Sequence, residues 1–208
     1  MGTPTPADTD ALPNGPLDAS AVHLCVDMQN LFARDTDWHT PWLARVLPDV
    51  RRLAARHPER TIFTRFIPAE RPGEGRGCWR RYYERWASMT IEALGPEMIN
   101  LVPELAALTP PAEVIDKTVY SPWLDPALET ALQRRGTGTL VITGGETDVC
   151  VLATVLGAVD RGYRIVLATD GLCSSCDDTH DALLTLYQQR FGQQIETARI
   201  DQILHNWI

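Results

Sequence analysis

The stretch TLVITGGETDVCVLATVLGAVD, residues 139–160, carries the pattern that decides the fold. It opens with the apolar run 139–142, which predicts a short buried strand, and then passes through two glycines. From Val151 to Val159 apolar residues recur three to four positions apart, as expected of one buried helix face. A strand, a glycine-rich turn and a helix in this order are typical of a parallel sheet covered by helices.

The same alternation continues on both sides of this stretch. Helical periodicity, for example over 43–53 and 182–187, separates further apolar runs. The runs lie at 21–26, 61–64, 113–115, 139–142, 164–168 and, more weakly, 194–196. We therefore predict one α/β domain over 21–208 with a three-layer αβα architecture. Its middle layer would be a mostly parallel, six-stranded, Rossmann-like sheet. Residues 1–20 are rich in Pro, Asp, Thr and Gly and predict a flexible N-terminal tail.

Composition narrows the class of protein. Of the 208 residues, 44% are hydrophobic and 22% are charged, which is ordinary for a globular domain. The formal net charge of −8 argues against nucleic acid as a partner, because phosphate binding needs a cationic face. No apolar run is long enough to suggest a membrane span or a membrane partner. Five cysteines without a secretory signal predict a reducing, cytoplasmic location.

Three chemically capable residues follow predicted strands. In a parallel sheet these positions share one edge, where ligands usually bind. Asp27 ends the first run, Lys117 follows the third, and Cys150 follows the glycine-rich turn. Thr147 is the expected helix N-cap, which would place Cys150 in the first turn, where free N–H groups favour a thiolate. Taken singly, each has a structural alternative: a capping carboxylate, a solvated lysine and a buried cysteine.

Together these positions resemble the isochorismatase-like cysteine hydrolases, a superfamily that includes nicotinamidases and N-carbamoylsarcosine amidohydrolases. The matching segments are VDMQN at 26–30, DK at 116–117 followed by Tyr-Ser at 120–121, and GGETDVCV at 144–151; the resemblance runs from about residue 20 to about residue 200. It implies a triad of Cys150, Asp27 and Lys117. The physical logic agrees: a thiol with a pKa of about 8.5 needs a proton acceptor, and a lysine lets a carboxylate and a developing thiolate coexist.

The resemblance also implies a reaction. Cys150 would attack a carbonyl and form a thioester while a carbon–nitrogen bond of a small amide, ureide or carbamoyl compound breaks, with Asp27 as general acid and base. The backbone N–H groups of Glu146 and Cys150 would form the oxyanion hole, with a cis peptide at Gly145–Glu146. Relatives suggest a homodimer or homotetramer. The alternatives are a vinyl-ether hydrolase and a catalytically silent binding or oligomerisation module.

Two features bear on metals and redox chemistry. Metal-dependent nicotinamidases carry Asp and His after the second strand, whereas residues 64–70 here contain neither. We therefore expect no metal and no cofactor. Cys173 and Cys176 have CxxC spacing, but a zinc site would need a second ligand pair. We interpret 173–176 as small side chains at a strand-to-helix turn, with a thiol-redox role as the alternative.

An aromatic segment follows the second strand. Trp79, Tyr82, Tyr83 and Trp86 recur at helical spacing and would form one stripe, which packs on the core or a partner subunit or else forms a pocket wall. Trp38 would add to such a wall, and Arg65 at a strand end would bind a substrate carboxylate. The substrate-pocket candidates are Phe32, Arg65, Trp79, Tyr83, Trp86 and Trp123.

Overall fold

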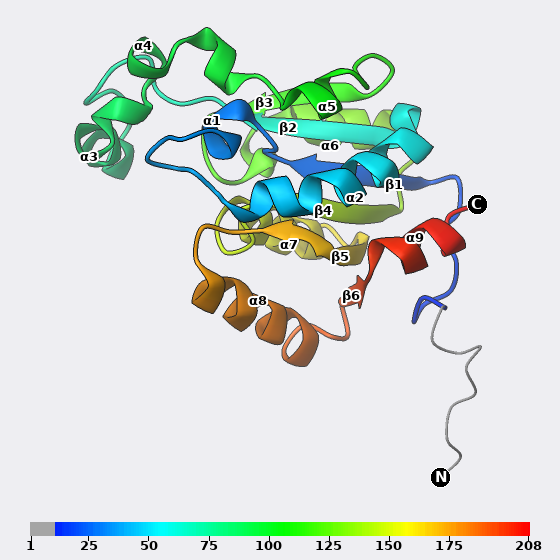
Figure 1. The fold of residues 1–208 in the computed structure, drawn as a ribbon. Coiled ribbons are helices and arrows are strands. Elements are labelled where there is room, and N and C mark those ends of the chain that lie inside the picture. Colours follow the sequence, from blue (N-terminus) through cyan, green and yellow to red (C-terminus); the bar gives the residue numbers. More distant parts are fainter. Residues whose placement is uncertain (1–10) are drawn as a thin grey trace.

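The computed structural model describes residues 11–208 and contains a six-stranded sheet in which every pairing is parallel (Figure 1). The strands lie in the spatial order β3-β2-β1-β4-β5-β6. Their bounds are β1 Ala21–Val26, β2 Thr61–Phe66, β3 Glu113–Lys117, β4 Thr139–Gly145, β5 Arg164–Cys173 and β6 Ile195–Ala198. The predicted α/β fold is confirmed, with a fully parallel sheet.

Helices cover both faces of the sheet (Figure 1). Alternate residues of β1 point to opposite faces, so Val22 and Leu24 join the core beneath α6, α7 and α8, while Cys25 packs on the side of α2 and α5. The α-helices are α1 Asn30–Ala33, α2 Trp42–Arg56, α3 Cys78–Arg85, α4 Ile91–Leu94, α5 Pro103–Ala106, α6 Pro126–Arg134, α7 Cys150–Asp160, α8 Asp177–Gln189 and α9 Ile200–Asn206. Short 3₁₀ turns occupy η2 Pro58–Arg60, η3 Ala87–Met89, η4 Pro96–Ile99 and η5 Pro122–Leu124.

The strand order reverses between β1 and β4. The chain builds outward from β1 to β2 and β3, and then returns to place β4 on the other side of β1. In such sheets the carboxyl ends of the two strands at the reversal flank a natural crevice. Asp27 directly follows β1, and Cys150 lies five residues beyond the end of β4, so the topology brings both to this crevice.

Strands β2 to β5 all extend beyond the apolar runs that predicted them, and β4 and β5 extend furthest. β4 extends through both glycines and pairs with β5 as far as Gly145 and Cys173, after a register shift between Ile142 and Gly144. Gly144 has φ +105°, and a Cβ at this position would lie 2.1 Å from the Val26 carbonyl oxygen. Only glycine therefore allows β4 to approach the end of β1 so closely.

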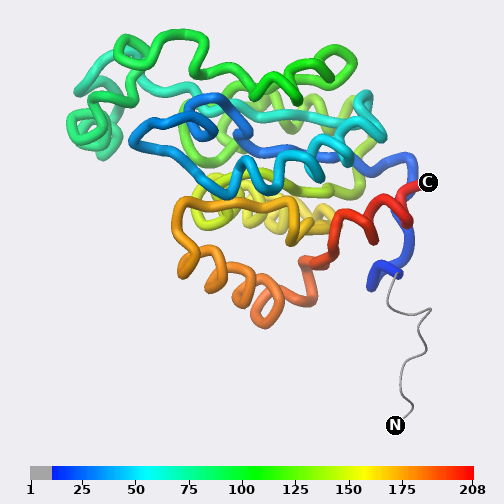
Figure 2. The backbone as a smooth tube through the Cα atoms, viewed as in Figure 1, coloured from blue at the N-terminus to red at the C-terminus, as the bar shows by residue number. Residues whose placement is uncertain are grey.

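The segment before β1 packs against the end of the chain. Leu12 and Leu17 are buried, and the Leu17 N–H donates to the carbonyl of Asn206 at 2.8 Å, so the N-terminal segment runs beside α9 (Figure 2). Residues 11–20 thus do not form the tail that composition suggested, and residues 1–10 of the predicted tail lie outside the described part. No helix within 11–208 has the length and apolar character needed to cross a bilayer.

Candidate active site

Asp27 is held in an unusual backbone conformation at the end of β1. Its φ is +53°, and among the described non-glycine residues it alone has a positive φ. Its N–H donates to the Thr64 side chain at 3.2 Å, and the Thr64 hydroxyl donates to Asp27 Oδ1 at 2.6 Å. Both residues are fully buried, so β2 fixes the direction in which the carboxylate points. Thr64 was not assigned this role from the sequence, although its position near the end of β2 was the available signal.

Lys117 links the other two residues. Its Nζ lies 2.6 Å from Asp27 Oδ2 and 3.4 Å from Cys150 Sγ, and it also donates to the Val119 carbonyl at 3.2 Å. The lysine ends β3, two strands away from β1, and its side chain crosses β2 to reach the crevice. The structure thus brings together the three residues that the sequence singled out, Asp27, Lys117 and Cys150.

Burial controls the protonation of this cluster. Burial would lower the pKa of Lys117, but the charge of Asp27 and the hydrogen bonds to Asp27 and Cys150 outweigh it, and the lysine pKa lies above its usual value. Burial and then the Asp27 carboxylate raise the pKa of the Cys150 thiol well above its usual range, while Lys117 offsets part of this rise. Cys150 therefore rests as a thiol rather than as the thiolate expected from its position in the first turn of a helix.

The loop between β4 and α7 is held in place by hydrogen bonds from Thr147 to the end of β5. Thr147 is fully buried and donates to the Cys173 carbonyl through both its N–H, at 2.9 Å, and its hydroxyl, at 3.1 Å. Its hydroxyl also lies 2.8 Å from His180 Nδ1. The helix cap expected at Thr147 is not formed, because α7 begins at Cys150 with Val149 in the cap position. Thr147 instead anchors the loop to the end of β5.

Unpaired backbone N–H groups remain beside Cys150. The Gly145–Glu146 peptide bond is cis, as the resemblance predicts. Within residues 11–208, the N–H groups of Glu146, Asp148 and Cys150 have no hydrogen-bond acceptor, whereas those of Thr147 and Val149 are both bonded. Cys150 is the first residue of α7, where unpaired N–H groups also favour an anion.

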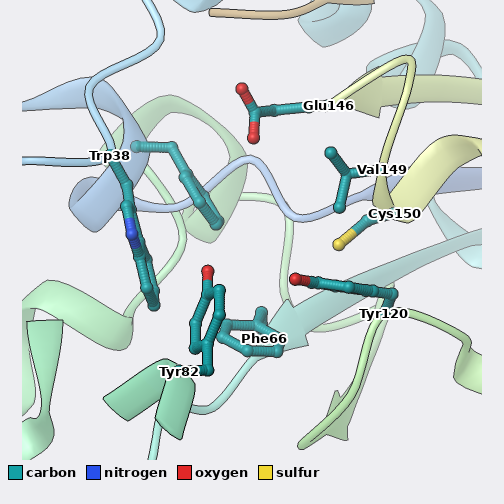
Figure 3. A pocket seen from close by; sticks show the side chains of 8 residues that line it. Trp38, Phe66, Tyr82, Tyr120, Glu146, Val149 and Cys150 are labelled. Atoms are coloured by element: carbon teal, nitrogen blue, oxygen red, sulfur yellow. The ribbon is translucent and has the colours of Figure 1, made fainter. Parts of the chain in front are cut away.

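A small cavity opens onto Cys150 (Figure 3). Its volume is about 100 Å³, and aromatic rings form most of its wall. These rings are Phe32, Trp38, Phe66, Tyr82 and Tyr120, and the remaining lining residues are Glu146, Val149 and Cys150. We call this space the active-site cavity. Phe66 ends β2, and the other rings come from the segments after β1, β2 and β3, with Phe32 on α1 and Tyr82 on α3. Glu146 and Val149 lie between β4 and α7, and Cys150 begins α7.

The aromatic segment contributes less directly than its spacing suggested. α3 places Tyr82 in the wall, whereas Trp79 packs behind it, with its ring 5.2 Å from Tyr82. Trp79 and Tyr83 line a separate cavity of about 320 Å³. Trp86 contacts the wall residue Trp38 edge-on at 6.3 Å. Trp79 and Trp86 thus support the wall from outside the active-site cavity, and Tyr83 lines the separate cavity. Of the six pocket candidates, only Phe32 lines the active-site cavity.

Arg65 and Trp123 lie elsewhere. Arg65 makes a two-pronged contact with Asp116, opposite it on β3, at 2.7 and 2.8 Å, so its guanidinium is committed to a neighbouring strand. Trp123 donates to the Thr154 carbonyl at 2.9 Å and covers Gly157, where a Cβ would lie 2.1 Å from its ring. Its role is therefore to pack η5 against α7.

In the described part of the chain, no group of three His, Cys, Asp or Glu residues is placed to hold a metal ion. All five cysteines are unpaired; Cys173 is buried at the end of β5 and Cys176 is exposed before α8.

Comparisons with known proteins agree with this geometry. The model of the isochorismatase domain matches residues 21–199. Nicotinamidase 3 of Arabidopsis thaliana is 25% identical over 83% of this chain and 81% of its own length, and the ureidoacrylate amidohydrolase RutB of Methylobacterium radiotolerans is 35% identical over 47% of this chain. The RutB match spans only 39% of that protein, and several other curated relatives are likewise matched over less than half of their length.

A solved structure has the same fold. The cysteine hydrolase from Pseudomonas syringae pv. phaseolicola superposes with a TM-score of 0.78 and 22% identity, with 100% of both chains covered. The fold, the strand-end triad and the match to the domain model together place this chain in the isochorismatase family of hydrolases.

Proposed function

We propose that this protein is a cysteine-dependent hydrolase of a carbon–nitrogen bond in a small amide, ureide or carbamoyl compound. The observation that carries the proposal is the contact of one buried ammonium, Lys117 Nζ, with both Asp27 and Cys150 beside a small cavity. The names of the relatives, a nicotinamidase and a ureidoacrylate amidohydrolase, support an amide-type substrate.

In the first half of the reaction, Asp27 takes the thiol proton as Cys150 Sγ attacks the substrate carbonyl carbon. A base is needed because the raised pKa of Cys150 leaves the resting thiol protonated. Lys117 stays charged and stabilises the anionic sulfur as it forms. Protonated Asp27 then delivers its proton to the leaving nitrogen, the carbon–nitrogen bond breaks, and an acyl thioester remains on Cys150.

In the second half, water replaces the departed amine or ammonia. Asp27 takes a proton from this water, the resulting oxygen nucleophile attacks the thioester carbon, and the carbon–sulfur bond breaks. The sulfur recovers its proton from Asp27, which restores the resting thiol and carboxylate and releases the acid product. Both halves use the same carboxylate, which agrees with its fixed direction beside Thr64.

Each half passes through a tetrahedral intermediate with a negative oxygen. The unpaired N–H groups of Glu146 and Cys150 are the donors that we assign to this oxygen. Fixed donors of this kind typically contribute ~10²–10³ in rate. The bracing of Thr147 by the end of β5 keeps the loop that carries the Glu146 donor in place.

The test is a screen for ammonia or amine release over amides, ureides and carbamates, run with the wild type and with Cys150→Ser. Turnover by the wild type alone, with an acyl adduct on Cys150 in the intact mass after acid quenching, would support the proposal. Release of a carbonyl product from a vinyl ether, or inertness to every compound together with an unreactive Cys150, would replace it with one of the alternatives. Light scattering of the purified protein tests the expected homodimer or homotetramer.

A further inference from the structure

Apart from the backbone N–H groups that we assign to the reacting oxygen, the active-site cavity is poor in groups that hold an anion. Five of its lining residues are aromatic, and none is Lys, Arg or His. Arg65, the one cation expected to bind a substrate carboxylate, is engaged by Asp116. The arginines of α3 are exposed, and none of them lines the cavity.

Glu146 gives this cavity a negative charge. Its carboxylate points toward the space between the rings (Figure 3). One oxygen, Oε1, accepts from the Ser175 N–H at 3.0 Å, and no basic side chain within residues 11–208 forms an ion pair with Glu146. A substrate group that donates to the other oxygen would therefore meet an uncompensated carboxylate.

The remaining charges beside the cavity cancel. Lys117 is paired with Asp27, and Cys150 rests as a neutral thiol. Burial raises the pKa values of Tyr82 and Tyr120, so both phenols stay neutral and present hydroxyl groups. Glu146 is thus the single uncompensated charge among the lining residues, in a protein whose net charge of −8 also attracts cations.

We propose that the active-site cavity selects small amides that carry a positive charge, such as an ammonium group, and discriminates against amides that carry a carboxylate. The aromatic faces of Trp38, Tyr82 and Phe66 provide the partly negative surface that attracts an organic cation, and Glu146 provides the opposite charge. A carboxylate in the same place would lose its water and face Glu146 with no cation to pair with it. The inference rests on the proposed amide hydrolysis only for the identity of the reacting group.

The cavity volume guides the choice of test compounds. About 100 Å³ is less than the ~150 Å³ of an enclosed, engineered protein cavity that holds benzene, so small amides are the appropriate probes. A three- or four-carbon amide is of the right size. The matched compounds are therefore β-alaninamide, butyramide and malonamate, which carry a cationic, a neutral and an anionic end on similar frames.

The first experiment compares kcat/KM for these three amides. We expect β-alaninamide to exceed butyramide by about tenfold or more, because charge-assisted contacts and cation–π attraction add to the common amide contacts, and malonamate to be slowest. Glu146→Gln should reduce the ratio of cationic to neutral kcat/KM, since its amide oxygen still accepts from Ser175 but its charge is gone. Glu84→Gln, an equal change of net charge on the exposed side of α3, should leave that ratio unchanged. Butyramide or malonamate as the best of the three would overturn the inference while leaving the hydrolase intact.

A second experiment needs no turnover. Alkylation of Cys150 by iodoacetamide at pH 9 is followed with tetramethylammonium chloride, tert-butanol or sodium acetate present, with sodium chloride used to equalise ionic strength. An occupant of the cavity blocks access to Cys150, so we expect protection by tetramethylammonium and not by the neutral or anionic compound. Equal or stronger protection by tert-butanol or acetate would refute cation selection even if none of the three amides is cleaved.

Discussion

Replacing Lys117 with methionine tests the electrostatic control of Cys150. Methionine keeps an unbranched, apolar side chain but removes the ammonium that lies 3.4 Å from Cys150 Sγ. At an effective dielectric constant of about 20, two unit charges at this distance interact by about 5 kcal/mol. Because Lys117 lowers the pKa of Cys150, the substitution raises that pKa further, and alkylation at pH 9 should slow by about a hundredfold or more.

Asp27→Asn should change the same rate in the opposite direction. The Asp27 carboxylate raises the pKa of Cys150, so its neutral replacement lowers that pKa and increases the thiolate fraction. Alkylation should accelerate by about tenfold or more, because the thiolate is the reactive form. Amide hydrolysis should nevertheless be lost, because no group remains to move the proton. Faster alkylation of Cys150 together with lost hydrolysis would show that Asp27 acts as the proton acceptor and not as a charge that activates the thiol.

The assay is peptide mapping by mass spectrometry after timed exposure to iodoacetamide. Cys78 and Cys176 are exposed and serve as internal references whose rates should be equal in all variants. Removing one partner of a buried ion pair costs about 3–5 kcal/mol of stability, so circular dichroism must show each variant folded at the assay temperature. If Lys117→Met reacts as fast as the wild type, or Asp27→Asn reacts more slowly, these two charges do not control the thiol.

Three further predictions concern residues outside the triad. Burial lowers the pKa of His23 to about 3, so below about pH 6.5 the unfolded chain binds a proton that the folded protein excludes. As the pH is lowered from about 6.5 to about 3, urea titrations should show the unfolding free energy falling by up to about 1.4 kcal/mol per pH unit. His23→Gln should reduce this slope. Gly157→Ala places a Cβ 2.1 Å from the Trp123 ring and should destabilise the fold by about 1–3 kcal/mol; an unchanged melting temperature would contradict the packing. Arg65→Met should lower the unfolding free energy by at most about 1 kcal/mol, as expected for a partly exposed ion pair with Asp116, and should leave KM unchanged. A rise in KM confined to carboxylate-bearing amides would show that Arg65 contacts the substrate.

The sheet could be predicted because buried parallel strands are apolar along their whole length. That pattern is local, so runs such as 21–26 located strands without knowledge of their neighbours. The same pattern placed Asp27, Lys117 and Cys150 at strand ends that share one edge, and the resemblance to the isochorismatase-like hydrolases joined them into a triad. The extension of β4 through Gly144 and Gly145 was not predictable in this way, because it depends on a close approach to Val26 that only the assembled sheet reveals.

The choice of pocket residues depended on partners far away in the sequence. Arg65 and Asp116 are 51 residues apart, and only the pairing of β2 with β3 places them opposite each other. Trp123 and Tyr120 both follow β3, yet one ring turns toward α7 and the other toward Cys150. Composition and spacing do not distinguish such neighbours. The raised pKa of Cys150 was not visible in the sequence for a related reason, because a helix terminus is a local feature whereas burial is a property of the whole fold.

The division of the active-site cavity between two kinds of structure has an evolutionary consequence. Asp27 directly follows the inner strand β1, and Lys117 ends the edge strand β3. Trp38 and Tyr82 instead lie on connecting segments outside the sheet. Mutation can therefore alter the connecting segments without disturbing proton transfer, so descendants of one ancestor can acquire new substrate specificities while they keep the same reaction. Exchange of residues 67–99 between homologues should accordingly transfer substrate preference, and it offers a practical route to redesign.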